Sequence, residues 1–195
     1  MSARIPYTAS PRPDTGLTNG TLGLWLFLAS ETMLFGSLLS AYAILRSGAT
    51  DWEAPVHLTT GIVATVLLAA ASAAMLVAQR TARRGRFGWC RAANAAAFGI
   101  GLAFLAVKFA DYSSNAAAGF VPATNNFAGL YYVLTGLHAL HVLGGLIVIG
   151  YFAGPGARLS RTDPGRFAGR VGVAAGYWHF VDAVWLVLFA VLYLA

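Results

Sequence analysis

The sequence predicts an all-α, polytopic membrane protein built as a bundle of five transmembrane helices. Of its 195 residues, 58% are hydrophobic and only 10% are charged, and the mean hydropathy is +0.66, which is unlike a soluble domain. Five continuous apolar stretches are long enough to cross a hydrocarbon core of about 30 Å, which takes roughly 20 helical residues. Barrel strands would instead alternate apolar and polar residues over short segments. We expect residues 1–195 to form a single membrane domain.

The first three spans are predicted at 22–45, 57–78 and 89–112. In the first, Glu31 interrupts an apolar run, and a seam of small residues that permits close helix packing lies on another side of the helix. The seam consists of Ala29, Gly36, Ser40 and Ala43. Because the seam points away from Glu31, this acid is expected to face a groove, a lipid or a partner subunit. In the third span, Lys108 and Asp111 are expected to pair and to snorkel toward the membrane interface.

The last two spans, 127–152 and 172–194, carry most of the candidate functional residues. His179 and Asp182 lie three residues apart in an apolar run, and ionisable groups in lipid usually mark functional sites. Span 127–152 carries a polar stripe at helical spacing. The stripe consists of Tyr131, Thr135, His138, His141 and Gly145. We expect His179 and Asp182 to act as an imidazole–carboxylate pair.

These ionisable groups are predicted to share one layer of the bundle. Counted at about 1.5 Å per residue from the inner helix ends, Glu31, His141 and Asp182 lie roughly 14 to 16 Å deep. Groups at one level could share protons and hydrogen bonds, which would lower the cost of placing them in lipid. The alternatives are that each histidine is an ordinary satisfied bundle residue, or that Glu31 is a protonated carboxyl bonded to a helix carbonyl.

The basic residues predict how the chain crosses the membrane. Eleven of the 13 arginines and lysines fall in the first tail and in the second and fourth loops with their flanks. They are Arg4, Arg12, Arg80, Arg83, Arg84, Arg86, Arg91, Arg158, Arg161, Arg166 and Arg170. Because short basic loops stay in the cytoplasm, the amino terminus is expected inside and the carboxyl terminus outside. The arginines follow the loops rather than forming a binding patch, so we expect no nucleic-acid partner.

Three segments resemble subunit III of the haem-copper cytochrome c oxidases, in the short, five-helix form found in bacteria. They are Tyr177-Trp-His-Phe-Val-Asp-Ala-Val-Trp185, Leu134-Thr-Gly-Leu-His-Ala-Leu-His-Val-Leu-Gly-Gly-Leu146 and Ser30-Glu-Thr-Met-Leu-Phe35. Their order and spacing also agree, and the resemblance runs from the first span to the last residue. The chain departs from the family's frequent Lys-x-x-Glu-Tyr at Lys108-Phe-Ala-Asp-Tyr112, and from many relatives at Gly172.

The resemblance implies an accessory subunit of the bacterial inner membrane with no catalytic residue, metal or redox centre of its own. Haem and copper would lie on the partner subunits I and II, and a respiratory supercomplex is a further expected setting. The subunit would sustain proton uptake, protect the catalytic subunit during turnover and offer oxygen a lipid-lined path. A cleft holding structural phospholipid would split the bundle into a two-helix and a three-helix group.

The resemblance also assigns roles to particular residues. Glu31 matches the family's buried, carbodiimide-reactive glutamate. Tyr177 and Trp178 match the signature around the lipid cleft, where we also place Trp185. The family's inner polar cluster is matched by His138, His141, His179 and Asp182.

Two other functions remain open on the sequence. Related subunits serve quinol oxidases and some nitric oxide reductases, and copper in the accompanying subunit II would favour cytochrome c as electron donor. A small haem-binding electron carrier could use His141 and His179 as axial ligands, which a Soret band from the isolated chain would reveal. A metal site of two histidines and a carboxylate is a variant of that second function.

Overall fold

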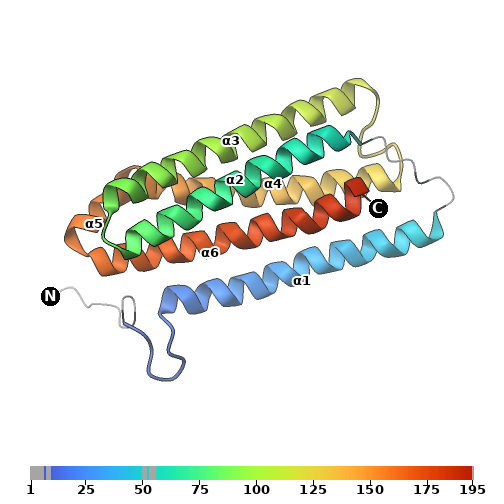
Figure 1. The fold of residues 1–195 in the computed structure, drawn as a ribbon. Coiled ribbons are helices and arrows are strands. Elements are labelled where there is room, and N and C mark those ends of the chain that lie inside the picture. The colour runs from blue at the N-terminus through green and yellow to red at the C-terminus, as the bar shows by residue number, and fades with distance from the viewer. Residues whose placement is uncertain (1–6, 8–9, 50–51, 53–55, 195) are drawn as a thin grey trace.

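The computed structural model describes residues 7, 10–49, 52 and 56–194, and all regular structure within them is helical (Figure 1). The elements in order are α1 (Asn19–Gly48), α2 (Leu58–Arg83), α3 (Phe87–Ala117), α4 (Asn126–Ala153), η1 (Pro155–Arg158), α5 (Leu159–Thr162), α6 (Pro164–Phe189) and the π-helical turn η2 (Ala190–Leu194). The five long helices, with η2 continuing α6, are long and apolar enough to cross a membrane. The prediction of an all-helical bundle with five spans is therefore confirmed.

The last span begins earlier than the predicted residue 172. α6 starts at Pro164, and the Asp163 side chain caps it by accepting a hydrogen bond from the backbone N–H of Arg166 over 3.0 Å. A proline in the first turn and an acidic cap are both typical helix starts. Hydropathy places the boundary where the apolar run begins, whereas the helix begins at the cap. Arg4, which the orientation prediction counts, lies outside the described residues.

The helices do not divide into groups of two and three. α2 packs against α3 and α6, and α4 packs against the same two helices, so these four form the main bundle. α1 packs against α6 and α4, and Figure 1 shows it running along the side of α6, with α3 across the bundle. The expected division into a two-helix and a three-helix group is therefore wrong, although the five-helix bundle itself is as predicted.

Side-chain size explains why α2 joins the main bundle and α1 does not. α2 buries a line of small residues, which lets neighbouring helices approach closely. The line includes Gly61, Ala64, Ala71, Ala78 and Ala82. α1 buries only Leu28, Phe35 and Tyr42, one residue every two turns, and its small-residue seam faces outward. A single row of contacts holds α1 to the rest of the chain.

The centre of the main bundle is filled by large aromatic side chains seated against glycines. Trp178 lies between Gly101 and Gly145, where an added Cβ would come within 3.0 Å of its ring at either position. Phe104 and Trp185 pack edge to face next to it, with ring centroids 5.2 Å apart. These glycines therefore make room for the indole, and the polar side chains of α4 and α6 are positioned around this packed centre.

Candidate functional site

Glu31 and His141 form a close carboxyl–imidazole contact between α1 and α4. Glu31 Oε2 lies 2.8 Å from His141 Nε2, and the two side chains are only 12% and 14% exposed. His141 Nδ1 lies 2.8 Å from the carbonyl oxygen of Leu137. Because a carbonyl can only accept, Nδ1 carries a hydrogen and donates it. Glu31 is thus bonded to an imidazole rather than to a helix carbonyl.

That geometry fixes how many protons the pair holds. With Nδ1 already donating, Nε2 either accepts a hydrogen from a protonated Glu31 or, in a charged ring, donates to the Glu31 carboxylate. One shared proton lies on the contact in both cases, and the pair has no net charge. A neutral pair of this kind lowers the cost of placing an acid among apolar helices.

Three helices meet at His141. The Phe35 ring of α1 packs edge to face on the imidazole at a centroid distance of 5.3 Å. The Tyr177 hydroxyl of α6 donates to the backbone carbonyl of His141 over 2.9 Å. The Glu31–His141 pair therefore joins α1 to α4 at the same residue at which Tyr177 joins α6 to α4.

Asp182 pairs with Ser72 of α2 and not with His179. The Ser72 hydroxyl donates to Asp182 Oδ2 over 2.6 Å, and Ser72 is buried. His179 Nε2 is buried with no hydrogen-bond partner among the described residues. The expected His179–Asp182 pair is wrong, because the short aspartate side chain reaches across to the neighbouring helix rather than along its own.

The Ser72–Asp182 hydrogen bond gives a first testable prediction. Ser72→Ala is expected to lower the stability of the chain by about 0.5 to 2 kcal/mol, the range of interhelical hydrogen bonds in membranes. Ser113→Ala is the matched control, because that exposed hydroxyl bonds only the Phe109 carbonyl of its own helix. Thermal unfolding of the purified complex compares the two. Equal stability of both variants would show that the contact with Asp182 contributes nothing measurable.

His138 is the most deeply buried of the histidines. It is fully buried, and its Nε2 donates to the Val181 carbonyl of α6 over 3.1 Å. Nδ1 therefore has no hydrogen and finds no partner among the described residues. The ring packs between Phe104 and Trp185, at centroid distances of 5.7 and 5.1 Å. His138 thus joins α4 to α6 inside the aromatic centre.

The predicted polar layer is thus a set of separate interhelical contacts. Glu31–His141 joins α1 to α4, His138 joins α4 to the α6 backbone, and Ser72–Asp182 joins α2 to α6. No hydrogen bond between described side chains connects one of these contacts to the next. Each of α1, α2 and α4 therefore has its own polar attachment to a neighbour.

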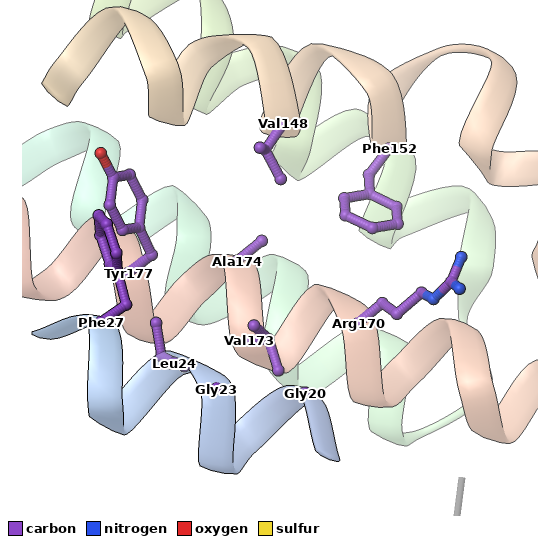
Figure 2. A pocket seen from close by; sticks show the side chains of 10 residues that line it. All are labelled: Gly20, Gly23, Leu24, Phe27, Val148, Phe152, Arg170, Val173, Ala174 and Tyr177. Carbon is purple, nitrogen blue, oxygen red and sulfur yellow. The ribbon is translucent and has the colours of Figure 1, made fainter. Parts of the chain in front are cut away.

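Two cavities flank α1 near its first residues. One, of about 410 Å³, lies between α1, α4 and α6, and Figure 2 shows Phe27 and Tyr177 together at one end and Arg170 at the other. The second, of about 390 Å³, lies between α1, α2 and α6 and includes Gln79 and Arg83. These two cavities thus lie beside α1 rather than between a two-helix and a three-helix group.

The three aromatic residues assigned to the lipid cleft have different positions. Tyr177 lines the cavity between α1, α4 and α6. Trp178 and Trp185 are 1% and 0% exposed and belong to the core, so their assignment to the cleft is corrected. The Trp185 ring also donates from Nε1 to the Thr65 hydroxyl of α2 over 3.0 Å. Packing on the shared helix face, rather than a ligand, accounts for both indoles.

A second polar cluster, around Lys108, has a different position from the one predicted. Lys108 and Asp111 do pair, with Nζ and Oδ2 2.7 Å apart, but their side chains are only 2% and 3% exposed, so they do not snorkel. Lys108 also donates to the hydroxyls of Tyr131 and Tyr193, over 2.9 and 3.2 Å. The Tyr112 and Tyr131 rings approach Nζ to within 5.0 Å. Tyr131 in the polar stripe was the sequence signal for this site.

A metal site requires several histidine, cysteine or acidic side chains close together. Within the residues that the structure describes, no three histidine, cysteine or acidic side chains gather closely enough to hold a metal ion. Cys90 is buried, and the Asn94 amide of the same helix lies 3.4 Å from its sulfur.

The fold and these contacts define a polytopic helical membrane protein with a carboxyl–imidazole pair between two of its spans. The family model described as Cytochrome c oxidase subunit III matches residues 14–195. The chain therefore belongs to the cytochrome c oxidase subunit III family, the third subunit of haem-copper oxidases, which also includes quinol oxidase subunits. It is a subunit of a cytochrome oxidase complex, an oxidoreductase, and associates with other oxidase subunits.

Individual relatives agree with the family. The chain is 32% identical over 182 residues to Cytochrome c oxidase subunit 3 of Thermostichus vulcanus, covering 89% of this chain and 86% of the relative. It is 32% identical to Cytochrome c oxidase subunit 3 of Alkalihalophilus pseudofirmus, with coverages of 90% and 86%. It is 29% identical to Cytochrome bo(3) ubiquinol oxidase subunit 3 of Pseudomonas aeruginosa, with coverages of 90% and 85%. Five apolar spans and this family fit a multi-pass bacterial membrane protein.

Proposed function

We propose that the chain is the accessory, non-redox subunit III of a proton-pumping terminal oxidase that takes electrons from cytochrome c and reduces oxygen to water. In this role it stabilises the catalytic subunit, supports proton uptake and holds lipid. Haem and copper belong to subunits I and II in this assignment. The Glu31–His141 contact is the observation that carries it, because it places an exchangeable proton at the junction of three spans.

The chemistry of the Glu31–His141 pair suits proton uptake. The pair holds one shared proton between the carboxyl and the imidazole and is neutral. Both side chains keep a small exposed fraction, so the pair is not sealed inside the bundle. Such a pair would hold an exchangeable proton at the α1–α4 contact.

The cavity between α1, α4 and α6 suits a phospholipid. Its walls are almost entirely apolar, and Arg170 lies at one end, where it can contact a phosphate. Figure 2 shows the Arg170 side chain and the Phe152 ring on either side of that end. An acyl chain along Leu24 and Val173 would fill the space between α1 and the main bundle.

The arginine distribution supports an orientation in the bacterial inner membrane. Arg80 and Arg83 lie in the last turn of α2, and Arg158 and Arg161 lie in the connection from α4 to α6, so both basic ends are on one side. The excess of basic residues in short connections favours the cytoplasm for that side. The amino terminus would then be cytoplasmic and the carboxyl terminus outside.

The equivalent subunit of a quinol oxidase is the second candidate. The Pseudomonas aeruginosa relative, a ubiquinol oxidase subunit, matches nearly as well as the cytochrome c oxidase subunits do. We favour cytochrome c because both relatives at 32% identity carry that name. Purification of the native complex discriminates the two: a copper-containing subunit II supports cytochrome c, and a copper-free one supports quinol.

Glu31→Gln tests the proposed role in proton uptake. Glutamine can still donate to His141 Nε2, so the α1–α4 contact and assembly are expected to survive, while the carboxyl proton is lost. We expect a near-normal initial rate of oxygen reduction, a lower proton-pumping yield and faster loss of activity during turnover. The measurements are oxygen consumption and proton release by the purified complex in vesicles.

Ser37→Ala is the matched control, because Ser37 is exposed on the same helix and bonds only the Leu34 carbonyl. Its activity and pumping should follow the wild-type time course. If Glu31→Gln also followed that time course, the proposed role of the pair in proton uptake would be refuted, although the family assignment would stand.

A further inference from the structure

A cavity with three arginines among its six lining residues lies where α4 ends and the connection to α6 begins. Its volume is about 500 Å³, and its lining comes from α3, η1, α5 and the residues between them. The lining residues are Arg91, Gly154, Pro155, Ala157, Arg158 and Arg161. None of them lines either cavity beside α1, so this basic pocket is separate from the space proposed above for lipid.

The charges around the basic pocket are not balanced by this chain. Arg91 donates from Nε to the carbonyl of Ala153 over 2.7 Å, which fixes its guanidinium at the end of α4. None of the three arginines forms an ion pair within the described residues. The nearby acid, Asp163, is engaged as the cap of α6. Three positive charges around one cavity repel one another, and an anion between them would offset that repulsion.

The surface next to the basic pocket is apolar. The Tyr151 ring of α4 lies against Gly156 of the connection, and Phe98 of α3 lies against Gly150 one turn deeper, so α3 and α4 are in close contact here. Leu102 of α3 and Ile147 of α4 are exposed further into the span. A band of exposed apolar side chains therefore continues from the arginines toward the membrane interior.

We propose that this basic pocket binds the phosphate of an anionic glycerophospholipid whose acyl chains lie along the exposed apolar surface of α3 and α4. Guanidinium groups bind phosphate through paired hydrogen bonds, and basic pockets between transmembrane helices hold lipid head groups. A free phosphate would satisfy the arginines but would make no use of the apolar surface. A phospholipid would contact both the arginines and the apolar surface. This site is separate from the cavity between α1, α4 and α6 that the proposed function assigns to lipid.

Lipid retention by the whole oxidase complex tests the proposal. The complex is purified from membranes, exchanged into nanodiscs of phosphatidylcholine with a minor share of phosphatidylglycerol, and analysed by native mass spectrometry. Arg158→Gln with Arg161→Gln is expected to weaken phosphatidylglycerol retention by about tenfold or more. Arg84→Gln with Arg86→Gln removes the same charge from the exposed second loop and should retain lipid as the wild type does.

Two further measurements separate the possible ligands. A photoreactive phosphatidylglycerol should cross-link the wild-type chain within residues 154–161. This measurement needs only the wild-type complex, so it tests the proposal even if the double variant fails to assemble. Inorganic phosphate at millimolar concentration should not displace the lipid. Displacement by phosphate, with no cross-link, would identify a free-anion site and overturn the lipid assignment. If the Arg158→Gln, Arg161→Gln double variant kept its lipid but lost a partner subunit, the arginines would be a subunit contact. That result would also overturn the lipid assignment.

Discussion

Asp111→Leu is expected to destabilise the chain by about 3 to 5 kcal/mol, the usual cost of leaving one member of a buried ion pair without its partner. Lys108 Nζ would keep its two tyrosine hydroxyls but lose the carboxylate 2.7 Å away, and its side chain is only 2% exposed. Tyr131 would also lose its acceptor, because its hydroxyl donates to the same Asp111 oxygen over 2.6 Å. An uncompensated ammonium group inside the bundle is the reason for the large effect.

The cost should extend beyond α3, because the Lys108 cluster joins three elements. Tyr131 belongs to α4 and Tyr193 to η2, so the cluster fastens the end of the last span to the two helices beside it. The loss of stability is measured by heating the purified complex and monitoring the release of this subunit. We expect the variant subunit to leave the complex at a clearly lower temperature than the wild type.

A double variant provides the decisive comparison. Lys108→Met with Asp111→Leu removes both charges and replaces them with apolar groups of similar size, so most of the lost stability should return. Asp14→Asn is the control for charge removal, because the Arg12–Asp14 pair is exposed to solvent. A double variant as unstable as Asp111→Leu would show that the cluster's shape, and not the unpaired charge, determines stability.

The number and type of the spans could be predicted because hydropathy alone determines them. A run of about 20 apolar residues has few alternatives to a helix in lipid, so all five spans were predicted at nearly the right places. The start of α6 was missed because Pro164 and the Asp163 cap lie in a polar segment that hydropathy scores as a loop. Helix starts depend on local hydrogen bonds that an averaged index does not detect.

Polar partners were harder to predict than polar positions. The sequence placed Glu31, His141 and Asp182 on helices, but the helix–helix contacts determine which residues they meet. Asp182 reaches Ser72 of α2 because α2 packs closely on α6 through small residues, a neighbour relation that spacing along α6 does not reveal. The three-residue spacing of His179 and Asp182 suggested a pair within one helix, whereas the partner of Asp182 lies on another helix.

The depth of Lys108 and Asp111 was missed for a related reason. Near the end of an apolar run, a lysine usually extends to the interface, and the sequence favoured that outcome. Here Lys108 donates to the tyrosine hydroxyls of α4 and η2, and Tyr131 itself belongs to an aromatic cluster with Phe120 and Phe127. The pair can be buried because α3, α4 and η2 pack together here and the tyrosine hydroxyls of α4 and η2 accept hydrogen bonds from Lys108.

The second large effect is expected at the contact that holds α1. His141→Leu should lower stability by about 1 to 3 kcal/mol, because the Glu31 carboxyl is left among apolar side chains without its hydrogen-bond partner. α1 buries only three large residues against the bundle, so the loss of this contact should loosen the whole helix. Retention of the subunit in the heated complex measures the effect.

A double-mutant cycle separates the contact from the loss of the individual side chains. Glu31→Leu, His141→Leu and their combination should give a coupling energy of about 0.5 to 3 kcal/mol. The double variant should lose less stability than the sum of the losses in the two single variants. Thr32→Ala is the control on α1, because that hydroxyl bonds only the Leu28 carbonyl of its own helix. Additive losses would mean that the 2.8 Å contact does not attach α1. The helix would then be held by its apolar packing and by the Tyr42 hydroxyl, which donates to the Val191 carbonyl over 3.1 Å.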